Sequence, residues 1–223
     1  MRRAAGTLVL CAALTGCHSV VGGTAAPADH LGPLPGTTVA AKPVTVADML
    51  LDAGEVAGIV GTATMVDHHE FTEPDTGAPV TQPSGCNIRI YPADSFAYTG
   101  WVTFAGRIEH GAEKQIVAQV VAGFKDDKNP GVELYAARSL WEGCTQPFTT
   151  NTDTAVSHWT PGEITKADDR VTAMTHKDNG QDCAHTFAAK GIHLAETVLC
   201  TDDGQTAQRA GALIDAILAK IPQ

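Results

Sequence analysis

The fold of this chain is decided by residues 182–200, which run Asp182-Cys-Ala-His-Thr-Phe-Ala-Ala-Lys190, then Gly191, then Ile192-His-Leu-Ala-Glu-Thr-Val-Leu-Cys200. Two short strand-length runs that flank a glycine are typical of a β-hairpin with a tight turn. A turn centred on Gly191 and Ile192 places Cys183 directly opposite Cys200, with Cα atoms about 4.5–5.5 Å apart. A disulfide fits that separation. We therefore predict a hairpin that is closed by a Cys183–Cys200 bond.

The remaining cysteines extend this framework. Of the six cysteines in the chain, Cys11 and Cys17 belong to the N-terminal segment. The other four are Cys86, Cys144, Cys183 and Cys200. An even number of cysteines outside the cytosol is typical of disulfides. Four cysteines allow three connectivities, and the hairpin favours the one in which Cys86 pairs with Cys144. The competing use is a zinc site, which the absence of C-x-x-C spacing disfavours.

The N-terminal segment has the pattern of an export signal. Arg2 and Arg3 precede a short apolar run at 7–14, which is too short to span a bilayer. Leu14-Thr15-Gly16-Cys17 then resembles a bacterial lipobox. The resemblance implies a lipoprotein signal peptide at 1–16 and a Cys17 that carries a diacylglyceryl thioether and an N-acyl chain, which together anchor a protein stably. The alternative is an ordinary secretory signal with a cysteine at this position by chance.

A change of composition separates this segment from the rest of the chain. Residues 18–43 are rich in Gly, Ala, Pro, Thr and Ser and show no sustained helical or strand period. We therefore expect residues 17–43 to form a flexible tether between the lipid and a folded domain at 44–223.

The folded region mixes helical and strand patterns. We expect helical pieces within 44–60, a long loop at 62–85, strands at 101–108, 115–124, 155–159 and 170–176, and helices at 129–143 and from Asp203 to Pro222. Pro161-Gly162 is expected to turn between two of these strands. This mixture predicts an α+β domain with a mostly antiparallel sheet and helices at its start, middle and end.

The composition excludes several classes of function. The 223 residues are 43% hydrophobic and carry a formal net charge of −10. Such a chain can bury a core, but it lacks the basic surface of a nucleic-acid-binding protein. We find no G-x-S-x-G, P-loop or G-x-G-x-x-G motif. We therefore expect no nucleic-acid partner, no cofactor and no enzymatic activity.

The densest polar cluster is Asp67-His68-His69-Glu70. His69 and Glu70 begin like the zinc-protease motif H-E-x-x-H, but Glu73 stands where the second histidine belongs. Weak binding of a divalent metal by His68 and His69 is one interpretation. We favour a solvated loop without a metal site.

Four residues are candidates for ligand binding. His185 and Glu196 fall diagonally across the predicted hairpin on one face. Such a pair can orient a general base, but we favour a structural pair. Trp159 follows His158 near a strand end and precedes a turn, so it is either a core residue or a platform for a ligand.

Several segments of the folded region carry a family resemblance. They are Asp48-Met49-Leu50-Leu51, Ser139-Leu-Trp-Glu-Gly-Cys144, Cys183-Ala184-His185 with Cys200 a hairpin later, and Ala207 to Pro222. Their order and the four-cysteine arrangement resemble the PknH-type extracellular sensor domain of actinobacteria, which also occurs as free-standing lipoproteins. The resemblance covers roughly residues 43–223. It implies a twisted antiparallel sheet flanked by helices, two disulfides that include Cys183–Cys200, and an open cleft suspected of binding a small ligand.

The lipobox and the resemblance together predict a location and a function. We expect a lipoprotein that is anchored by Cys17 on the extracytoplasmic face of the cell membrane. There it would act as a non-catalytic sensor module for a small molecule, lipid or glycan of the cell envelope. Two alternatives remain: an envelope hydrolase that uses His185 and Glu196, and a scaffold that recruits another envelope protein. The chain has no kinase motif, so any signal must pass through a partner.

Overall fold

The computed structural model describes residues 43–74, 79–97, 99–112, 114–152 and 155–222. The predicted signal peptide, Cys17 and the tether up to residue 42 lie outside these ranges. Across the described ranges, we find no helix with the length and apolar character needed to cross a membrane. The described residues belong to one unit that begins at Pro43.

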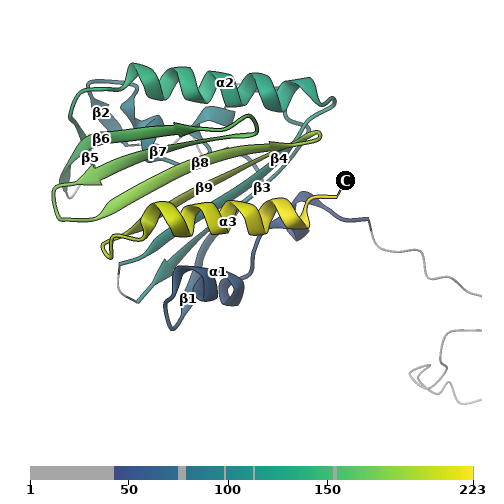
Figure 1. The fold of residues 1–223 in the computed structure, drawn as a ribbon, viewed down its shortest axis with the longest axis horizontal. Helices are drawn as coiled ribbons and strands as arrows, with labels where there is room; N and C mark the ends of the chain where they lie inside the picture. Colours follow the sequence, from purple (N-terminus) through teal and green to yellow (C-terminus); the bar gives the residue numbers. More distant parts are fainter. Residues whose placement is uncertain (1–42, 75–78, 98, 113, 153–154, 223) are drawn as a thin grey trace, which may run out of the picture. The chain divides into compact units, whose positions relative to one another are not determined.

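One antiparallel sheet of nine strands organises the described residues (Figure 1). Its strands are β1 (Met65–Phe71), β2 (Val80–Gln82), β3 (Thr103–Gly111), β4 (Ile116–Gly123), β5 (Phe148–Asn151), β6 (Val156–Lys166), β7 (Arg170–Lys177), β8 (Asp182–Lys190) and β9 (His193–Thr201). Their spatial order is β1-β3-β4-β9-β8-β7-β6-β5-β2. The hairpin of β8 and β9 therefore lies at the centre of the sheet, and the predicted α+β class is confirmed.

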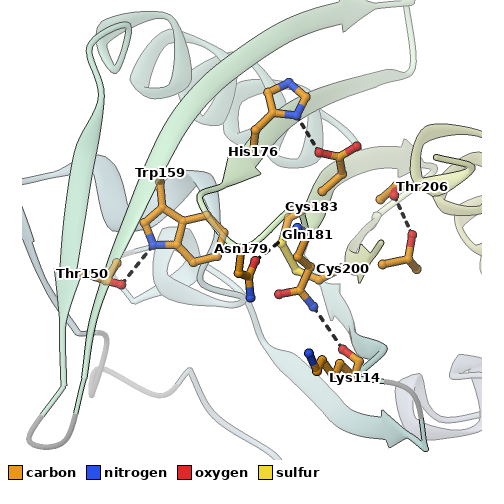
Figure 2. The surroundings of a disulfide bond; sticks show 11 residues. Lys114, Thr150, Trp159, His176, Asn179, Gln181, Cys183, Cys200 and Thr206 are labelled. Atoms are coloured by element: carbon orange, nitrogen blue, oxygen red, sulfur yellow. Dashed lines mark hydrogen bonds and ion pairs between the residues drawn. A yellow bond between two sulfur atoms is a disulfide. The ribbon is translucent and has the colours of Figure 1, made fainter. Parts of the chain in front are cut away.

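The central hairpin has the predicted register. Cys183 lies opposite Cys200 with Cα atoms 4.0 Å apart, and a disulfide joins them (Figure 2). Gly191 occupies the turn with φ at +56°, a left-handed conformation that glycine adopts without steric cost. The second disulfide joins Cys86 and Cys144, whose Cα atoms are 5.5 Å apart. Both predicted disulfides are present in the structure.

Helices cover both faces of the sheet (Figure 1). One face carries η1 (Val46–Met49), α1 (Ala53–Val60) and α3 (Thr206–Lys220), and we call it the α3 face. The opposite face carries η2 (Cys86–Arg89), η3 (Asp94–Phe96) and α2 (Lys128–Gly143), and we call it the α2 face. Because side chains alternate along a strand, Ala195 and Leu199 of β9 pack under α3 whereas Leu194 packs on the α2 face.

The α3 face is sealed by an apolar stripe of the C-terminal helix. The stripe consists of Ala210, Leu213, Ile214 and Ile217, which are all fully buried. It repeats at the i, i+3, i+4, i+7 spacing of an amphipathic helix, and the sequence pattern predicts most of it. Small residues of the sheet, among them Ala184 and Ala188, let the helix approach closely.

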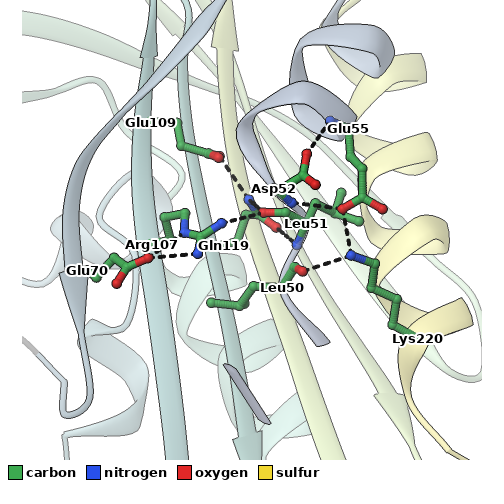
Figure 3. Close-up of polar contacts among 9 residues, drawn as sticks. All are labelled: Leu50, Leu51, Asp52, Glu55, Glu70, Arg107, Glu109, Gln119 and Lys220. Atoms are coloured by element: carbon green, nitrogen blue, oxygen red, sulfur yellow. Dashed lines mark hydrogen bonds and ion pairs between the residues drawn. The ribbon is translucent and has the colours of Figure 1, made fainter. Parts of the chain in front are cut away.

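Polar side chains fasten the N-terminal segment to the same face (Figure 3). The buried amide of Gln119 accepts from the Leu51 backbone N–H at 2.8 Å and donates to the Glu109 carboxylate at 2.8 Å. Lys220 of α3 donates to the Leu50 carbonyl at 3.0 Å and to the Glu55 carboxylate at 2.6 Å. These bonds satisfy backbone groups that the short helices leave unpaired, and they hold η1 and α1 over the sheet.

Two short edge strands replace the long loop that we expect at 62–85. Within this stretch β1 pairs with β3, and β2 pairs with β5, itself a strand absent from the sequence prediction. Edge strands are held by backbone hydrogen bonds on one side only, so they tolerate polar side chains. The ion pair of Glu70 with Arg107, at 2.7 Å, adds a cross-strand contact to β1. The prediction of a long loop from the polar composition of 62–85 was therefore wrong.

The predicted turn at Pro161-Gly162 is also wrong. β6 continues through these residues to Lys166, and the register with β7 shifts between Pro161 and Ile164. A shift of this kind accommodates a proline, which cannot donate a ladder bond. A Cβ on Gly162 would lie 2.7 Å from Nε2 of His176, so the close approach of that ring requires a glycine. The turn before β7 falls at 167–169 instead.

Both long helices begin near the predicted positions. α2 begins at Lys128, after Asp126, whose carboxylate accepts from the backbone N–H groups of Lys128 and Asn129. α3 begins at Thr206, and the Asp203 carboxylate accepts from the Gln205 N–H at 3.0 Å. The acceptor carboxylates, Asp126 and Asp203, thus lie before the N-cap residues, which are Asp127 for α2 and Gln205 for α3.

Candidate functional site

His185 of β8 and Glu196 of β9 form the diagonal pair that the hairpin register predicts. Nε2 of His185 lies 2.5 Å from Oε1 of Glu196, and both residues are 0% exposed. The Ala93 backbone N–H donates to both carboxylate oxygens, at 3.1 and 2.9 Å. Ala93 has a φ of +64°, a left-handed conformation that alanine rarely adopts. The carboxylate therefore holds a strained turn against the sheet.

Trp141 of α2 covers this pair. The rings of Trp141 and His185 have centroids 4.8 Å apart, and the indole N–H donates to the Ile88 carbonyl at 2.8 Å. Phe187 also stacks on the imidazole, with centroids 5.2 Å apart, and contacts Trp141 at 5.4 Å, so the three rings form one cluster. Nδ1 of His185 is buried and has no hydrogen-bond partner within the described part of the chain. A general base needs a ring nitrogen that reaches a substrate, whereas both residues of this pair are fully buried.

A buried arginine fastens η2 beneath α2. The Arg89 guanidinium donates to the carbonyls of Trp141, Gly162 and Met174 at 3.2, 2.9 and 3.1 Å. Burial lowers the pKa of this guanidinium. The Arg89 and Glu196–Ala93 contacts attach residues 86–96 to the sheet, and the Cys86–Cys144 bond attaches them to the end of α2.

A groove with a volume of about 350 Å³ lies on the same face, beside the sealed pair. Its floor is made by Ile108, Ala118 and Val198, which are adjacent in register on β3, β4 and β9. Tyr91 and Pro92, from the segment that Glu196 and Arg89 fasten, line one wall. The remaining lining residues include Pro79, Ile90, His110, Ile116, Thr150, Ser157, Trp159, Lys177, Gln181 and Cys200.

Trp159 lines this groove. Its side chain is mostly buried, and its indole N–H donates to the Thr150 hydroxyl at 3.0 Å (Figure 2). Its ring stacks on Phe148. Nζ of Lys177 lies 5.1 Å from the ring centroid, within the range of a cation–π contact. His158 is exposed and lines a neighbouring hollow of about 240 Å³, which shares Trp159 and Lys177 with the groove.

The four predicted ligand residues therefore fall into two groups. Trp159 and His158 border open hollows, whereas His185 and Glu196 lie under α2 and do not line the groove. The aliphatic floor residues and the Tyr91–Pro92 wall are absent from the sequence prediction. They come from strands and a segment that are distant along the chain, and only the register brings them together.

The predicted polar loop at 67–70 forms part of β1. The His69 ring stacks on Phe71, with centroids 5.7 Å apart. The side chains of Asp67 and His68 lie outside the described part of the chain. Among the side chains that the structure describes, no three from His, Cys, Asp or Glu gather in a way that could hold a metal ion.

These features define a disulfide-linked α+β domain whose twisted antiparallel sheet carries a groove on one face. The family model for the PknH-like extracellular domain matches residues 41–220, so the chain belongs to that family. The family resemblance predicted from the sequence is confirmed.

A solved structure shows the same fold. The crystal structure of the extracellular domain of PknH from Mycobacterium tuberculosis is similar with a TM-score of 0.72 and 18% sequence identity, over 80% of this chain and 97% of that chain. A structure of an uncharacterized protein from Mycobacterium smegmatis shares 12% identity with a TM-score of 0.32, over 76% of this chain and 97% of that one. No curated protein matches the chain.

Family membership gives the coarse function. The chain is a sensor-type module of an extracellular domain family, and its location is accordingly extracytoplasmic.

Proposed function

We propose that this protein is a cell-surface lipoprotein whose groove binds a small molecule, lipid or glycan of the cell envelope without transforming it. The groove itself carries the proposal. Its volume of about 350 Å³ falls in the range of small-molecule sites, and an apolar lining with a few polar groups is typical of such sites. Membership of an extracellular sensor-type family agrees with this role.

The absence of catalysis is the second part of the proposal. A hydrolase that uses His185 and Glu196 would need a substrate to reach the imidazole, but Trp141 and Phe187 cover it. The carboxylate is also committed to the Ala93 N–H. The geometry therefore supports binding and gives the hydrolase alternative no accessible dyad.

Native mass spectrometry of the purified protein after exposure to a cell-envelope extract tests the binding function. We expect a retained component in the wild-type protein and none in Ala118→Phe, which fills the floor of the groove. The matched control is Val132→Phe on the exposed face of α2, which should retain the component. If the wild-type protein retains nothing, or if Ala118→Phe retains as much as the wild type, the groove is not the binding site.

The lipid anchor is tested separately. Metabolic labelling with a radioactive fatty acid should label the wild-type protein, and Cys17→Ser should remove both the label and the membrane association. Cys11→Ser serves as the control and should leave labelling unchanged. An unlabelled wild-type protein, or a labelled Cys17→Ser protein, would contradict the proposed anchor.

A further inference from the structure

The groove has an apolar interior and a polar mouth, and the strand register shows how this arises. Ile108, Ala118 and Val198 form one row across β3, β4 and β9. The next row toward the strand ends begins at His110, which pairs with Ile116, and Ile116 pairs with Cys200. The lining therefore becomes more polar in the direction in which β3 and β9 end.

Two further polar residues stand at the same end. Lys177 is the last residue of β7, and Gln181 precedes the first residue of β8. Both line the groove, as His110 does. The mouth thus presents a lysine, a histidine and an amide, while the floor behind them is aliphatic.

The charge of the lining contrasts with that of the whole chain. The chain has 25 acidic residues against 15 Lys and Arg, yet the described residues that line the groove include no aspartate or glutamate. Asp178 borders only the neighbouring hollow. The Lys177 ammonium lies over the Trp159 ring, 5.1 Å from its centroid. A lining whose described side chains include a lysine and no carboxylate complements a negatively charged group.

We propose that the ligand of the groove is an amphiphile with an apolar body and an anionic end group, such as an acyl chain that ends in a carboxylate or a phosphate. This inference rests on the proposed function, because it assumes that the groove is the binding site. The apolar body lies on Ile108, Ala118 and Val198. The anionic group lies at the mouth, where it forms a charge-assisted hydrogen bond with Lys177.

Three probes of equal chain length test the ligand class: decanoate, decyl phosphate and decanol. The Cys17→Ser protein is used, so that its own acyl groups cannot occupy the groove, and binding is measured by isothermal titration calorimetry. We expect at least one of the two anions to bind about tenfold more tightly than decanol, the ratio typical of one charge-assisted bond. Which anion binds more tightly distinguishes a carboxylate from a phosphate ligand.

Two lysine variants give the matched comparison. Lys177→Gln should reduce the affinity for the anion about tenfold and leave that for decanol unchanged. Lys166→Gln, on β6 and away from the groove, should change neither. Equal affinity for the anions and decanol, or an unchanged affinity in Lys177→Gln, overturns the ligand class. So does failure of all three probes to bind while a component of the envelope extract does, and in that case the proposed function stands. Failure of the probes and of the extract overturns both.

Discussion

The two halves of the α2 face differ both in their side chains and in what covers them. In one half, Trp141 and η3 lie over His185 and Glu196, and this polar pair is fully buried. In the other half, a groove of about 350 Å³ lies over Ile108 and Val198. The half that contains the His–carboxylate pair is thus closed to solvent, and the half with the aliphatic residues carries the groove.

The comparison shows that side-chain chemistry alone does not locate a site. A His–carboxylate pair acquires a function from its access to solvent, and α2 removes that access. The buried pair instead fixes the turn at Ala93, which precedes η3 and follows the Tyr91–Pro92 wall of the groove. The buried His185–Glu196 pair therefore holds in place the segment that forms one wall of the groove.

The largest expected effect is the loss of the buried carboxylate. Glu196→Ala leaves the Ala93 N–H and the His185 ring without their partner, so we expect the free energy of unfolding to fall by about 3–5 kcal/mol. Glu196→Gln keeps one acceptor oxygen and should cost less. Urea denaturation measures both variants. If Glu196→Ala has the same midpoint of urea unfolding as the wild type, the His185–Glu196 pair does not stabilise the turn at Ala93.

The two disulfides should differ in their contributions to stability. Their cysteines are 58 and 17 residues apart, which corresponds to about 4 kcal/mol for Cys86–Cys144 and about 3 kcal/mol for Cys183–Cys200 in the chain-entropy description. The double alanine variants, compared by urea denaturation, should follow that order. The Cys86–Cys144 variant should also bind ligand more weakly, because this bond fastens the groove wall. If that variant bound the ligand with wild-type affinity, the disulfide would not be needed to hold the Tyr91–Pro92 wall in place.

A matched pair of alanines compares the sealed α3 face with the groove. Ala184 is fully buried under α3, so Ala184→Phe should overpack the core and cost about 3 kcal/mol. Ala118→Phe extends into the groove, so it should cost less stability but abolish ligand retention. Thermal unfolding and native mass spectrometry report the two effects. A larger loss of stability in Ala118→Phe than in Ala184→Phe would mean that the floor of the groove is packed core.

The smallest expected effect concerns the ion pair that joins α1 to α3. Hydrogen bonding to Lys220 holds the pKa of the Glu55 carboxyl below its ordinary value. The ion pair therefore contributes to the free energy of unfolding above the unfolded-state pKa of about 4.5. This contribution is lost as the pH falls through the lower folded-state pKa of Glu55. Glu55→Gln should cost less than about 1 kcal/mol at pH 7 and nothing in acid.

The control for this prediction is Glu163→Gln, since Glu163 is exposed and forms no ion pair within the described residues. Its denaturation curves should match the wild type at both pH values. A cost of Glu55→Gln that persists in acid would assign the effect to packing rather than to the ion pair.

The elements predicted well are those whose signals are local in the sequence. Gly191 and the spacing of Cys183 and Cys200 set the register of the hairpin, and that register placed His185 beside Glu196. The i, i+3, i+4 stripe likewise predicted α3. Each of these signals lies within a single hairpin or helix, so no tertiary information was needed.

The groove could not be predicted because its parts are distant in sequence. Ile108, Ala118 and Val198 meet only through the pairing of three strands, and Tyr91 reaches them because Glu196 and Arg89 fasten its segment. The edge strands β1 and β2 were missed for a related reason, since backbone pairing at a sheet edge leaves little trace in side-chain patterns. Trp159 alone was predicted as a ligand candidate and lines the groove.

Nuclear magnetic resonance of isoleucine methyl groups tests the central claim most directly. Ile108 and Ile116 line the groove, whereas Ile214 and Ile217 are buried under α3. On titration with a cell-envelope extract, we predict shifts of the Ile108 and Ile116 methyl signals and constant Ile214 and Ile217 signals. Constant signals from Ile108 and Ile116 with a bound component present, or shifts confined to the α3 face, would contradict the assignment of the groove as the binding site.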